Sequence, residues 1–321
     1  MPANHLLPAV GQTTIGLRTP FGTWVPPGAR VAAYVGPQSE STDTYSSSGL
    51  LVATLQEGFA RCRSGKGDVV FVLPGHTQTI TTQTLFTNLV AGTQIIGCAP
   101  YGSGLMPTLT VTGTTTVATS TINVANVQMS GIRWNLNGAD SMDTPLVVTA
   151  AGCNINNCIF LTGSDTALDA DVAVTVSTGA DFFNLSGCYF YSTGTAVNTN
   201  SVLVSAAVDS LNISDNTFMV PAVASGIVQL GASTVVLTNL MVARNLLVNK
   251  STGLITIGYT DQAHTGMICD NYSQLTADAT LTTDGIKAAG LTNPLIQFAQ
   301  NFLCDGGNKG RSGILQPAVQ T

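Results

Sequence analysis

One eight-residue pattern decides the fold of this chain, and it occurs as VQMSGIRW (127–134), CNINNCIF (153–160), FNLSGCYF (183–190), LNISDNTF (211–218), LMVARNLL (240–247), GMICDNYS (266–273) and IQFAQNFL (296–303). Successive blocks start 26 to 30 residues apart. A period of this size is typical of stacked repeats, in which one unit cannot bury its apolar face alone. The sequence therefore predicts a repeat architecture with one continuous core.

Apolar residues recur inside the blocks with the period of two that a strand requires. Position three is apolar in every block: Met129, Ile155, Leu185, Ile213, Val242, Ile268 and Phe298. Position eight is also large and apolar in six of the seven: Trp134, Phe160, Phe190, Phe218, Leu247 and Leu303, with Ser273 as the exception. Because these positions are an odd number of residues apart, the chain must bend near positions five and six.

Position six shows a change of chemistry along the repeats. It holds Ile132, Cys158 and Cys188, and then Asn216, Asn245, Asn271 and Asn301. Side-chain amides stacked at the spacing of neighbouring strands, about 4.8 Å, can bond one another. We therefore predict an internal asparagine ladder, extended in apolar form by the earlier residues. The segment TQIIGCAP (93–100) fits the same frame and adds Cys98 to that column.

A second apolar strand precedes most blocks, at residues 146–150, 172–176, 201–205, 226–230, 253–257 and 284–288. Each coil thus offers about three short strands and one variable loop. The predicted fold class is all-β: a right-handed parallel β-helix of about seven to nine coils, each of about 28 residues.

The two ends differ from the repeats. Residues 47–66 are predicted to form a short capping helix, because Leu51, Leu55, Phe59 and Cys62 follow helical spacing. Such a helix would cover the strand edges of the first coil. Residues 1–46 form an irregular N-terminal arm with six prolines, residues 47–304 the β-helix domain, and residues 305–321 an irregular tail.

The composition excludes several classes of function. Only 9% of the residues are charged, the net charge is −6, and no Lys/Arg cluster offers a footprint for nucleic acid. Residues 1–14 show no basic start or long apolar core, so we expect no signal peptide. Polar residues interrupt the apolar segment 219–242, which is predicted to form two strands rather than a membrane span. Seven cysteines without metal-ligand spacing indicate reduced core thiols and assembly in a reducing cytosol.

The coils, the predicted helix and the segment GDVVFVLPG (67–75) resemble the pectate-lyase-like parallel β-helix superfamily over residues 47–304. Within it, LQEGFARCRSGKGDVVFVLPGHTQTI (55–80) is similar to a group of tailed-bacteriophage virion proteins, several of which decorate or cement capsids. The resemblance implies a β-helix far more firmly than an activity, since one fold hosts many functions.

Carbohydrate-cleaving members of the superfamily need paired carboxylates or acidic metal ligands. This chain has two glutamates, both before the coils, so any such site would rest on aspartates. The candidates are Asp165, Asp169, Asp171, Asp209, Asp215 and Asp270, of which Asp215 and Asp270 share a column with Arg244. A surface ladder of alternating charge and a solvated loop are the favoured interpretations. We expect no catalytic residue, no metal and no cofactor.

Position seven should point outward, and it is apolar or aromatic at Ile159, Tyr189, Leu246, Tyr272 and Phe302. An exposed apolar stripe of this length usually marks a partner surface. The resemblance to phage β-helices implies that the partner is the chain itself, and we predict a homotrimer interface there. The alternative is that loops of the same chain cover the stripe. Positions two and four are mostly small or polar, which predicts a wet face beside it. The predicted capsid-binding residues of the arm are Leu6, Leu7, Phe21 and Trp24.

These observations lead to the expectation of a non-enzymatic structural virion protein. It would be a homotrimeric decoration (cement) protein that is made in the host cytoplasm and stabilises the capsid exterior by binding the major capsid protein, with no nucleic acid and no membrane as partners. The alternative is a phage tailspike or adsorption protein that binds or cleaves host-surface polysaccharide, with Tyr189 and Tyr191 as exposed aromatics. A free polysaccharide lyase is the third interpretation.

Overall fold

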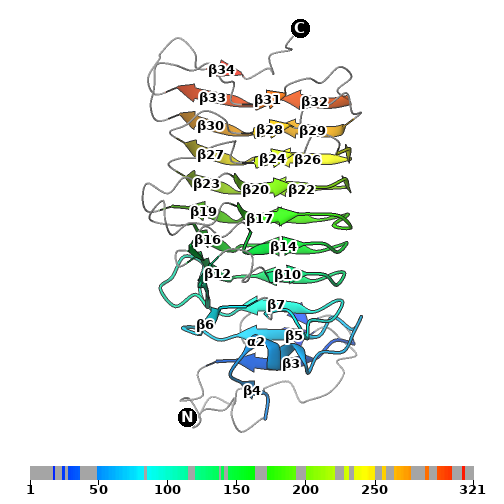
Figure 1. Cartoon of the computed structure of the whole chain (residues 1–321), viewed down its shortest axis with the longest axis vertical. Coiled ribbons are helices and arrows are strands. Elements are labelled where there is room, and N and C mark those ends of the chain that lie inside the picture. Colours follow the sequence, from blue (N-terminus) through cyan, green and yellow to red (C-terminus); the bar gives the residue numbers. More distant parts are fainter. Residues whose placement is uncertain are drawn as a thin grey trace.

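The structure is a computed structural model that describes residues 17–18, 24–25, 28–36, 49–82, 85–114, 120–136, 139–140, 144–162, 172–192, 200–220, 228–230, 235–249, 255–257, 264–275, 286–288, 295–305 and 313–314. Within these residues the chain is all-β apart from one short helix. It forms a parallel β-solenoid whose coils stack along the long axis (Figure 1), consistent with a pectate-lyase-like β-helix.

Three sheets form the wall of the solenoid. The eleven-stranded sheet contains, from one edge to the other, β4 (Leu51–Val52), β3 (Val31–Val35), β5 (Val69–Val72), β7 (Gln94–Gly97), β11 (Gln128–Ser130), β15 (Asn154–Asn156), β18 (Asn184–Ser186), β22 (Asn212–Ser214), β26 (Leu240–Ala243), β29 (Thr265–Cys269) and β32 (Leu295–Ala299). The ten-stranded sheet contains β6 (Thr77–Ile80), β8 (Thr108–Val111), β12 (Arg133–Asn135), β16 (Ile159–Leu161), β19 (Tyr189–Tyr191), β23 (Thr217–Val220), β27 (Leu246–Asn249), β30 (Tyr272–Leu275), β33 (Phe302–Asp305) and an antiparallel edge strand, β34 (Gly313–Ile314).

Six strands of the seven-stranded sheet correspond to the second strand series that the sequence predicts, and β10 (Ser120–Ile122) is an additional strand before them. The sheet contains β10, β14 (Leu146–Val148), β17 (Val172–Val176), β20 (Asn200–Val204), β24 (Val228–Leu230), β28 (Ile255–Ile257) and β31 (Ile286–Ala288). Three strand pairs lie outside these sheets: β1 (Leu17–Arg18) with β2 (Trp24–Val25), β9 (Gly113–Thr114) with β13 (Ala139–Asp140), and β21 (Val208–Asp209) with β25 (Leu237–Thr238).

The strand register confirms the repeat frame. Position-three residues pair from coil to coil, as Met129 does with Ile155 and Ile155 with Leu185, and the series continues to Phe298. The position-eight residues from Trp134 to Leu303 pair in the same way. Each coil therefore places equivalent side chains at the same height of the wall, which is what allows columns to form.

Aromatic rings fill the inside of the first coils. Trp134 stacks on Phe160 with ring centroids 6.3 Å apart, Phe160 on Phe190 at 4.6 Å, and Phe190 on Phe218 at 4.7 Å. Phe86 extends the stack below Trp134 at 6.4 Å. All five side chains are buried in one continuous core cluster, as the shared period of the blocks predicts.

The bend inside each block lies at position five. Gly131, Asn157, Gly187, Asp215, Arg244, Asp270 and Gln300 all have left-handed backbones, with φ between 50° and 69°. At Gly131 the choice of residue is also steric, because an added Cβ would lie 2.9 Å from the carbonyl oxygen of Gly97. The predicted bend is therefore confirmed, and it is a single left-handed residue in each block.

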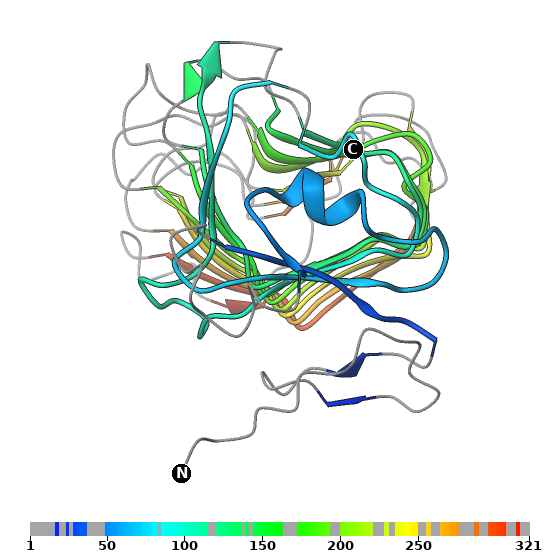
Figure 2. The same cartoon turned by 90° about the horizontal axis from the view of Figure 1, so that it is seen from below.

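The helix predicted over residues 47–66 is wrong in its bounds. α2 spans only Leu55–Phe59, and Leu51–Val52 pairs with β3 as β4 instead. The start is set by a capping box, in which Glu57 N–H donates to the Thr54 hydroxyl and the Thr54 N–H donates to the Glu57 carboxylate. Leu55 and Phe59 are buried in the core, and α2 lies within the outline of the stacked strands when they are seen along the axis (Figure 2).

Part of the predicted irregular arm also belongs to the wall. Val31–Val35 forms β3, which is paired on both sides within the eleven-stranded sheet. Its inner residues join the core, whereas Val31 and Tyr34 lie in a second buried cluster on the outer side with Val69, Phe71 and Leu73. The wall is thus buried on both faces at this end, and the arm boundary at residue 46 needs correction to about residue 27.

A buried carboxylate secures this end of the chain. Asp68 is fully buried and accepts hydrogen bonds from the Arg63 guanidinium (2.6 and 2.9 Å), the Arg63 N–H (2.9 Å) and the Arg30 N–H (3.1 Å). Burial alone would raise the pKa of Asp68, but these hydrogen bonds outweigh it and lower the pKa. The network joins the loop between α2 and β5, which contains Arg63 and Asp68, to the segment that leads into β3.

Several other predictions meet the structure only in part. The segment 219–242 contains the ends and beginnings of strands β23 and β26 and the whole of β24 and β25, and none of the described helical residues forms a helix long and apolar enough to cross a membrane. The count of seven to nine coils stays a prediction, because the three sheets differ in strand number.

Candidate interaction surface

The position-seven residues form one outward column on the ten-stranded sheet. Arg133 pairs with Ile159, and the register continues through Tyr189, Thr217, Leu246, Tyr272 and Phe302. A parallel column two residues further along the strands contains Asn135, Leu161, Tyr191, Met219 and Val248. We call these two columns the apolar face. After Arg133 they contain no charged residue.

The exposure of the apolar face rises toward the later coils. Leu246, Tyr272 and Phe302 are exposed by 37, 43 and 44%, and Met219 by 43%. Tyr189 is only partly buried. Four of the five predicted interface residues therefore reach the surface as expected.

Ile159 is the exception, because it is buried. It lies in register between Arg133 and Tyr189. The Arg133 guanidinium donates to the carbonyl oxygen of Ser103 at 3.2 Å, so the 98–107 loop reaches this part of the column. At Ile159 the alternative interpretation, coverage by the same chain, describes the structure better than an open stripe does.

Two tyrosines form an aromatic pair near the middle of the face. The rings of Tyr189 and Tyr191 are 5.3 Å apart and tilted, and the Tyr189 hydroxyl donates to the sulfur of Met219 at 2.9 Å. Tyr101, from the 98–107 loop, interacts electrostatically with Tyr189, and burial is the main cause that raises the pKa of Tyr101 to about 12. This hydroxyl therefore stays protonated at neutral pH.

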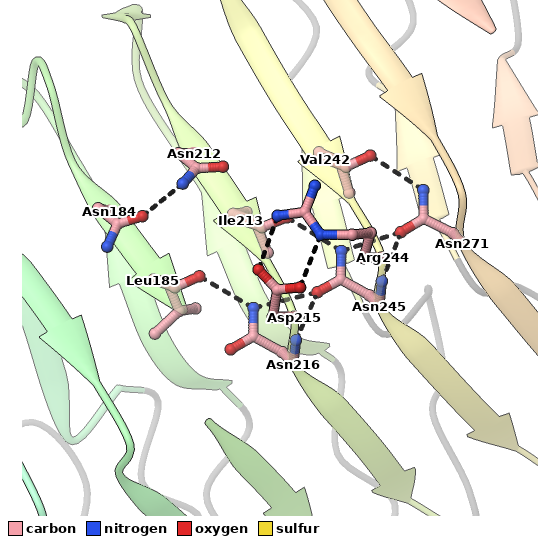
Figure 3. A network of polar contacts seen from close by, with 10 residues as sticks. All are labelled: Asn184, Leu185, Asn212, Ile213, Asp215, Asn216, Val242, Arg244, Asn245 and Asn271. Atoms are coloured by element: carbon pink, nitrogen blue, oxygen red, sulfur yellow. Dashed lines mark hydrogen bonds and ion pairs between the residues drawn. The ribbon is translucent and has the colours of Figure 1, made fainter. Parts of the chain in front are cut away.

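The asparagine ladder behind the face is present. The amide nitrogen of Asn216 donates to Oδ1 of Asn245 at 3.1 Å, Asn245 to Asn271 at 2.9 Å, and Asn271 to Asn301 at 2.9 Å. Each backbone N–H of the first three donates to the same oxygen of the next rung. Each amide also donates to a position-three carbonyl one coil earlier, as Asn216 does to Leu185 (Figure 3).

The thiols of the same column follow the pattern only partly. Cys188 N–H donates to Oδ1 of Asn216 at 2.9 Å, and its buried sulfur donates to the carbonyl oxygens of Ser186 and Ile155. Burial raises the pKa of the Cys188 thiol well above its ordinary value. Cys98 departs from the prediction, since it is half-buried and packs against the outer cluster around Tyr34 and Phe71 instead of the internal column.

The charged column at position five is a surface feature. Arg244 makes a bidentate ion pair with Asp215, at 2.7 and 2.8 Å, and both side chains are about half exposed. The Arg244 hydrogen bonds lower the pKa of Asp215. Asp270 lies one coil further, and no ion pair joins it to Arg244 among the described residues. The geometry is that of a solvated turn ladder (Figure 3).

The outer face of the eleven-stranded sheet has the opposite chemistry. Asn184 donates to Oδ1 of Asn154 at 2.8 Å and to the Ser186 hydroxyl at 3.1 Å, and Asn212 donates to Oδ1 of Asn184. The predicted wet face is thus an ordered amide array over these coils. It turns apolar later, at Met241, which is 38% exposed.

The remaining candidates lie outside the described residues. These are Asp165, Asp169 and Asp171 of the acidic loop, Leu6, Leu7 and Phe21 of the arm, and the side chain of Trp24. Within the described part of the chain, no group of three His, Cys, Asp or Glu side chains converges as a metal site would require.

Comparison of the chain with protein-family models, curated proteins and solved structures finds no match.

The sequence contained signals for two features that the prediction missed. Thr54 and Glu57 have the spacing of a capping box and so mark the true start of the helix. A second left-handed corner precedes the blocks at Gly92, Asn126, Gly152, Phe182, Ser210 and Asn239. Four of these six are glycine or asparagine, the types that favour such a backbone.

Proposed function

We propose that this chain is a non-enzymatic structural protein that assembles as a homotrimer through the apolar face. The supporting observation is the register of that face: its side chains lie in straight columns parallel to the solenoid axis. An uncharged, straight surface is complementary to a copy of itself, so parallel copies can pack coil against coil. The centre of the interface is Leu246, Tyr272 and Phe302.

The proposal includes a place for the trimer, the outer surface of a tailed-bacteriophage capsid. It follows from the resemblance of residues 55–80 to virion decoration proteins. Three arms on one trimer would multiply weak contacts with the major capsid protein through their high effective concentration. In this proposal the solenoid has seven to nine right-handed coils, and α2 covers the first of them. The stacked coils form a rigid wall.

The oligomeric state tests the apolar face directly. Leu246→Asp places a charge in the proposed interface and should convert a trimer into monomers in sedimentation equilibrium. Met241→Asp is the matched control, because Met241 lies in the same coil with nearly the same exposure, 38 against 37%, but on the eleven-stranded sheet. A monomeric wild type, or equal dissociation by both variants, contradicts the proposed interface.

Capsid binding tests the second part. Purified protein is added to capsids that lack it, and a chain that begins at Gly28 is compared with the full length. This truncation keeps β3 and the Gly28 carbonyl, to which Arg63 donates at 3.2 Å. A deletion up to residue 46 would instead remove a strand of the wall. Saturable binding that is lost with residues 1–27 supports the arm, and no binding of the full chain contradicts capsid decoration.

One observation favours a second candidate, an adsorption protein that binds host polysaccharide. Tyr189 and Tyr191 present neighbouring rings on the outside of the wall, and aromatic faces are common platforms for sugars. Incubation with host-surface polysaccharide, scored for bound glycan, new reducing ends and unsaturated sugars, separates the two. Released fragments would establish an enzyme and contradict the structural proposal.

A further inference from the structure

Phe182 combines two unfavourable properties at one corner of the solenoid, just before β18. Its backbone is left-handed, with a φ of 57°, and its side chain is 63% exposed. A bulky residue in this conformation is an outlier, and strain of this kind persists in proteins mainly where function uses it. The large exposed fraction of this residue leaves apolar surface in water at the same strained position.

The equivalent corners of other coils show what the fold itself needs. They are Gly92, Asn126, Gly152, Ser210 and Asn239, all left-handed, whereas Thr265 and Leu295 at the same place in the last two coils are not. Ser210 and Asn239 also use their side chains locally, since both donate to the carboxylate of Asp209, at 3.0 and 2.8 Å. Glycine or asparagine would therefore serve the turn at position 182 with less strain, and the ring has no comparable local role.

Two carboxylates lie near this corner of the backbone: Asp181 precedes Phe182 in the chain, and Asp209 lies in the next coil. The Phe182 N–H donates to the carbonyl oxygen of Asp209 at 2.8 Å, and the Asp209 N–H donates to Oδ1 of Asp181 at 2.9 Å. Hydrogen bonds, first from Thr238 and then from Asn239, lower the pKa of Asp209, which keeps it charged at neutral pH. Neither carboxylate takes part in the ion pairs of the described residues, which join Arg30 and Arg63 to Asp68 and Arg244 to Asp215.

We propose that Phe182 anchors a docking corner, with Asp181 and Asp209 at its rim, that binds a protein surface carrying an apolar pocket bordered by Lys or Arg. An exposed aromatic ring at a corner with two nearby carboxylates fits such a pocket by shape and by charge. A second copy of this chain is a poor partner for the corner. Its own corner is acidic and would repel this one, and its apolar face lies on a different sheet. The inference rests on the proposed function, since the partner surface it names is the capsid exterior.

The test compares three proteins on capsids that lack the chain. Phe182→Asn should bind about tenfold or more weakly, since the ring leaves the pocket, while its melting temperature rises by about 1–2 °C as strain is relieved. Leu105→Asn is the matched control, because it removes a side chain of similar exposure, 60%, from a loop without left-handed strain at that residue. Its affinity and melting temperature should stay at the wild-type values.

Each of the following binding results supports or overturns the docking corner at Phe182. Binding of Phe182→Asn at the wild-type level, while the wild type binds, overturns the docking corner and leaves capsid decoration intact. No binding by the wild type overturns both. An equal loss in Leu105→Asn indicates non-specific adhesion, and a changed oligomeric mass in Phe182→Asn indicates a contact with a second copy; either overturns the corner.

Discussion

The internal column at position six has two halves that fill the same backbone site with different chemistry. In the later coils Asn216, Asn245, Asn271 and Asn301 form a closed set of hydrogen bonds. In the earlier coils Ile132, Cys158 and Cys188 are buried to 1% exposure or less without such a set. The wall continues through both halves with unbroken register.

The difference shows that this site accepts either apolar side chains or a fully connected polar series. The boundary is the informative point, because Cys188 N–H uses Oδ1 of Asn216 as an Asn would. Its sulfur also points at the Ile155 carbonyl, the equivalent of the Leu185 carbonyl that Asn216 contacts. At this site a buried polar group is unfavourable when only some of its hydrogen-bond partners are present.

The largest expected effect comes from breaking the polar half. Asn245→Leu removes the acceptor of both the Asn216 N–H and its amide, and the donor to the Ile213 carbonyl. Buried donors without partners cost about 1–3 kcal/mol each, so the free energy of unfolding should fall by about 3–5 kcal/mol in chemical denaturation. Cys158→Val, at the same site of an earlier coil, should cost less than about 1.5 kcal/mol. Equal losses would show that the two halves do not differ.

Alkaline pH should act on the thiol half alone. Burial raises the pKa of Cys188 well above the ordinary value of 9.0. Above pH 9 the unfolded chain releases this proton while the folded chain retains it, so stability falls as pH rises, by about 1.4 kcal/mol per pH unit from this group. Denaturation at pH 8 to 10.5 should show a shallower decline in Cys188→Ala than in the wild type. Parallel declines would place the alkaline sensitivity elsewhere.

The smallest effect is expected where the two halves meet. Cys188→Asn extends the ladder by one rung, with Asn216 as the acceptor and the Ile155 carbonyl within reach of the new amide. Its stability should lie within about 1 kcal/mol of the wild type, since the new polar group finds partners. A loss as large as that of Asn245→Leu would mean that the ladder tolerates no rung at this coil.

The sequence predicts the repeating part of this protein well, because one period specifies many residues at once. The frame of the blocks correctly places the position-three residues from Met129 to Ile268 and the position-eight residues from Trp134 to Ser273 inside, the bend at position five and the ladder at position six. Each assignment is supported by several coils, so a single unusual residue such as Ser273 does not disturb it.

The parts of the chain without a repeat could not be predicted from the repeat period. β3 has no equivalent block from which its register could be inferred, and Ile159 is buried next to Arg133, which the 98–107 loop reaches. Asp68 with Arg63 and Arg30 joins segments up to 38 residues apart, a contact that no local pattern announces. Phe182 could not be predicted for another reason. It departs from the repeat, and this departure is seen only when the left-handed residues before the other blocks are known.

The direction of the asparagine ladder has a consequence for how the protein is made. Each rung donates its N–H and its amide to the rung that follows in the chain, as Asn216 does to Asn245. During synthesis each of the rungs Asn216, Asn245 and Asn271 therefore waits for the next 26 to 30 residues before these donors are paired. In a nascent chain that folds as it leaves the ribosome, only the last folded asparagine would have unpaired donors. These donors would bind the asparagine of the next coil and so help to set its register.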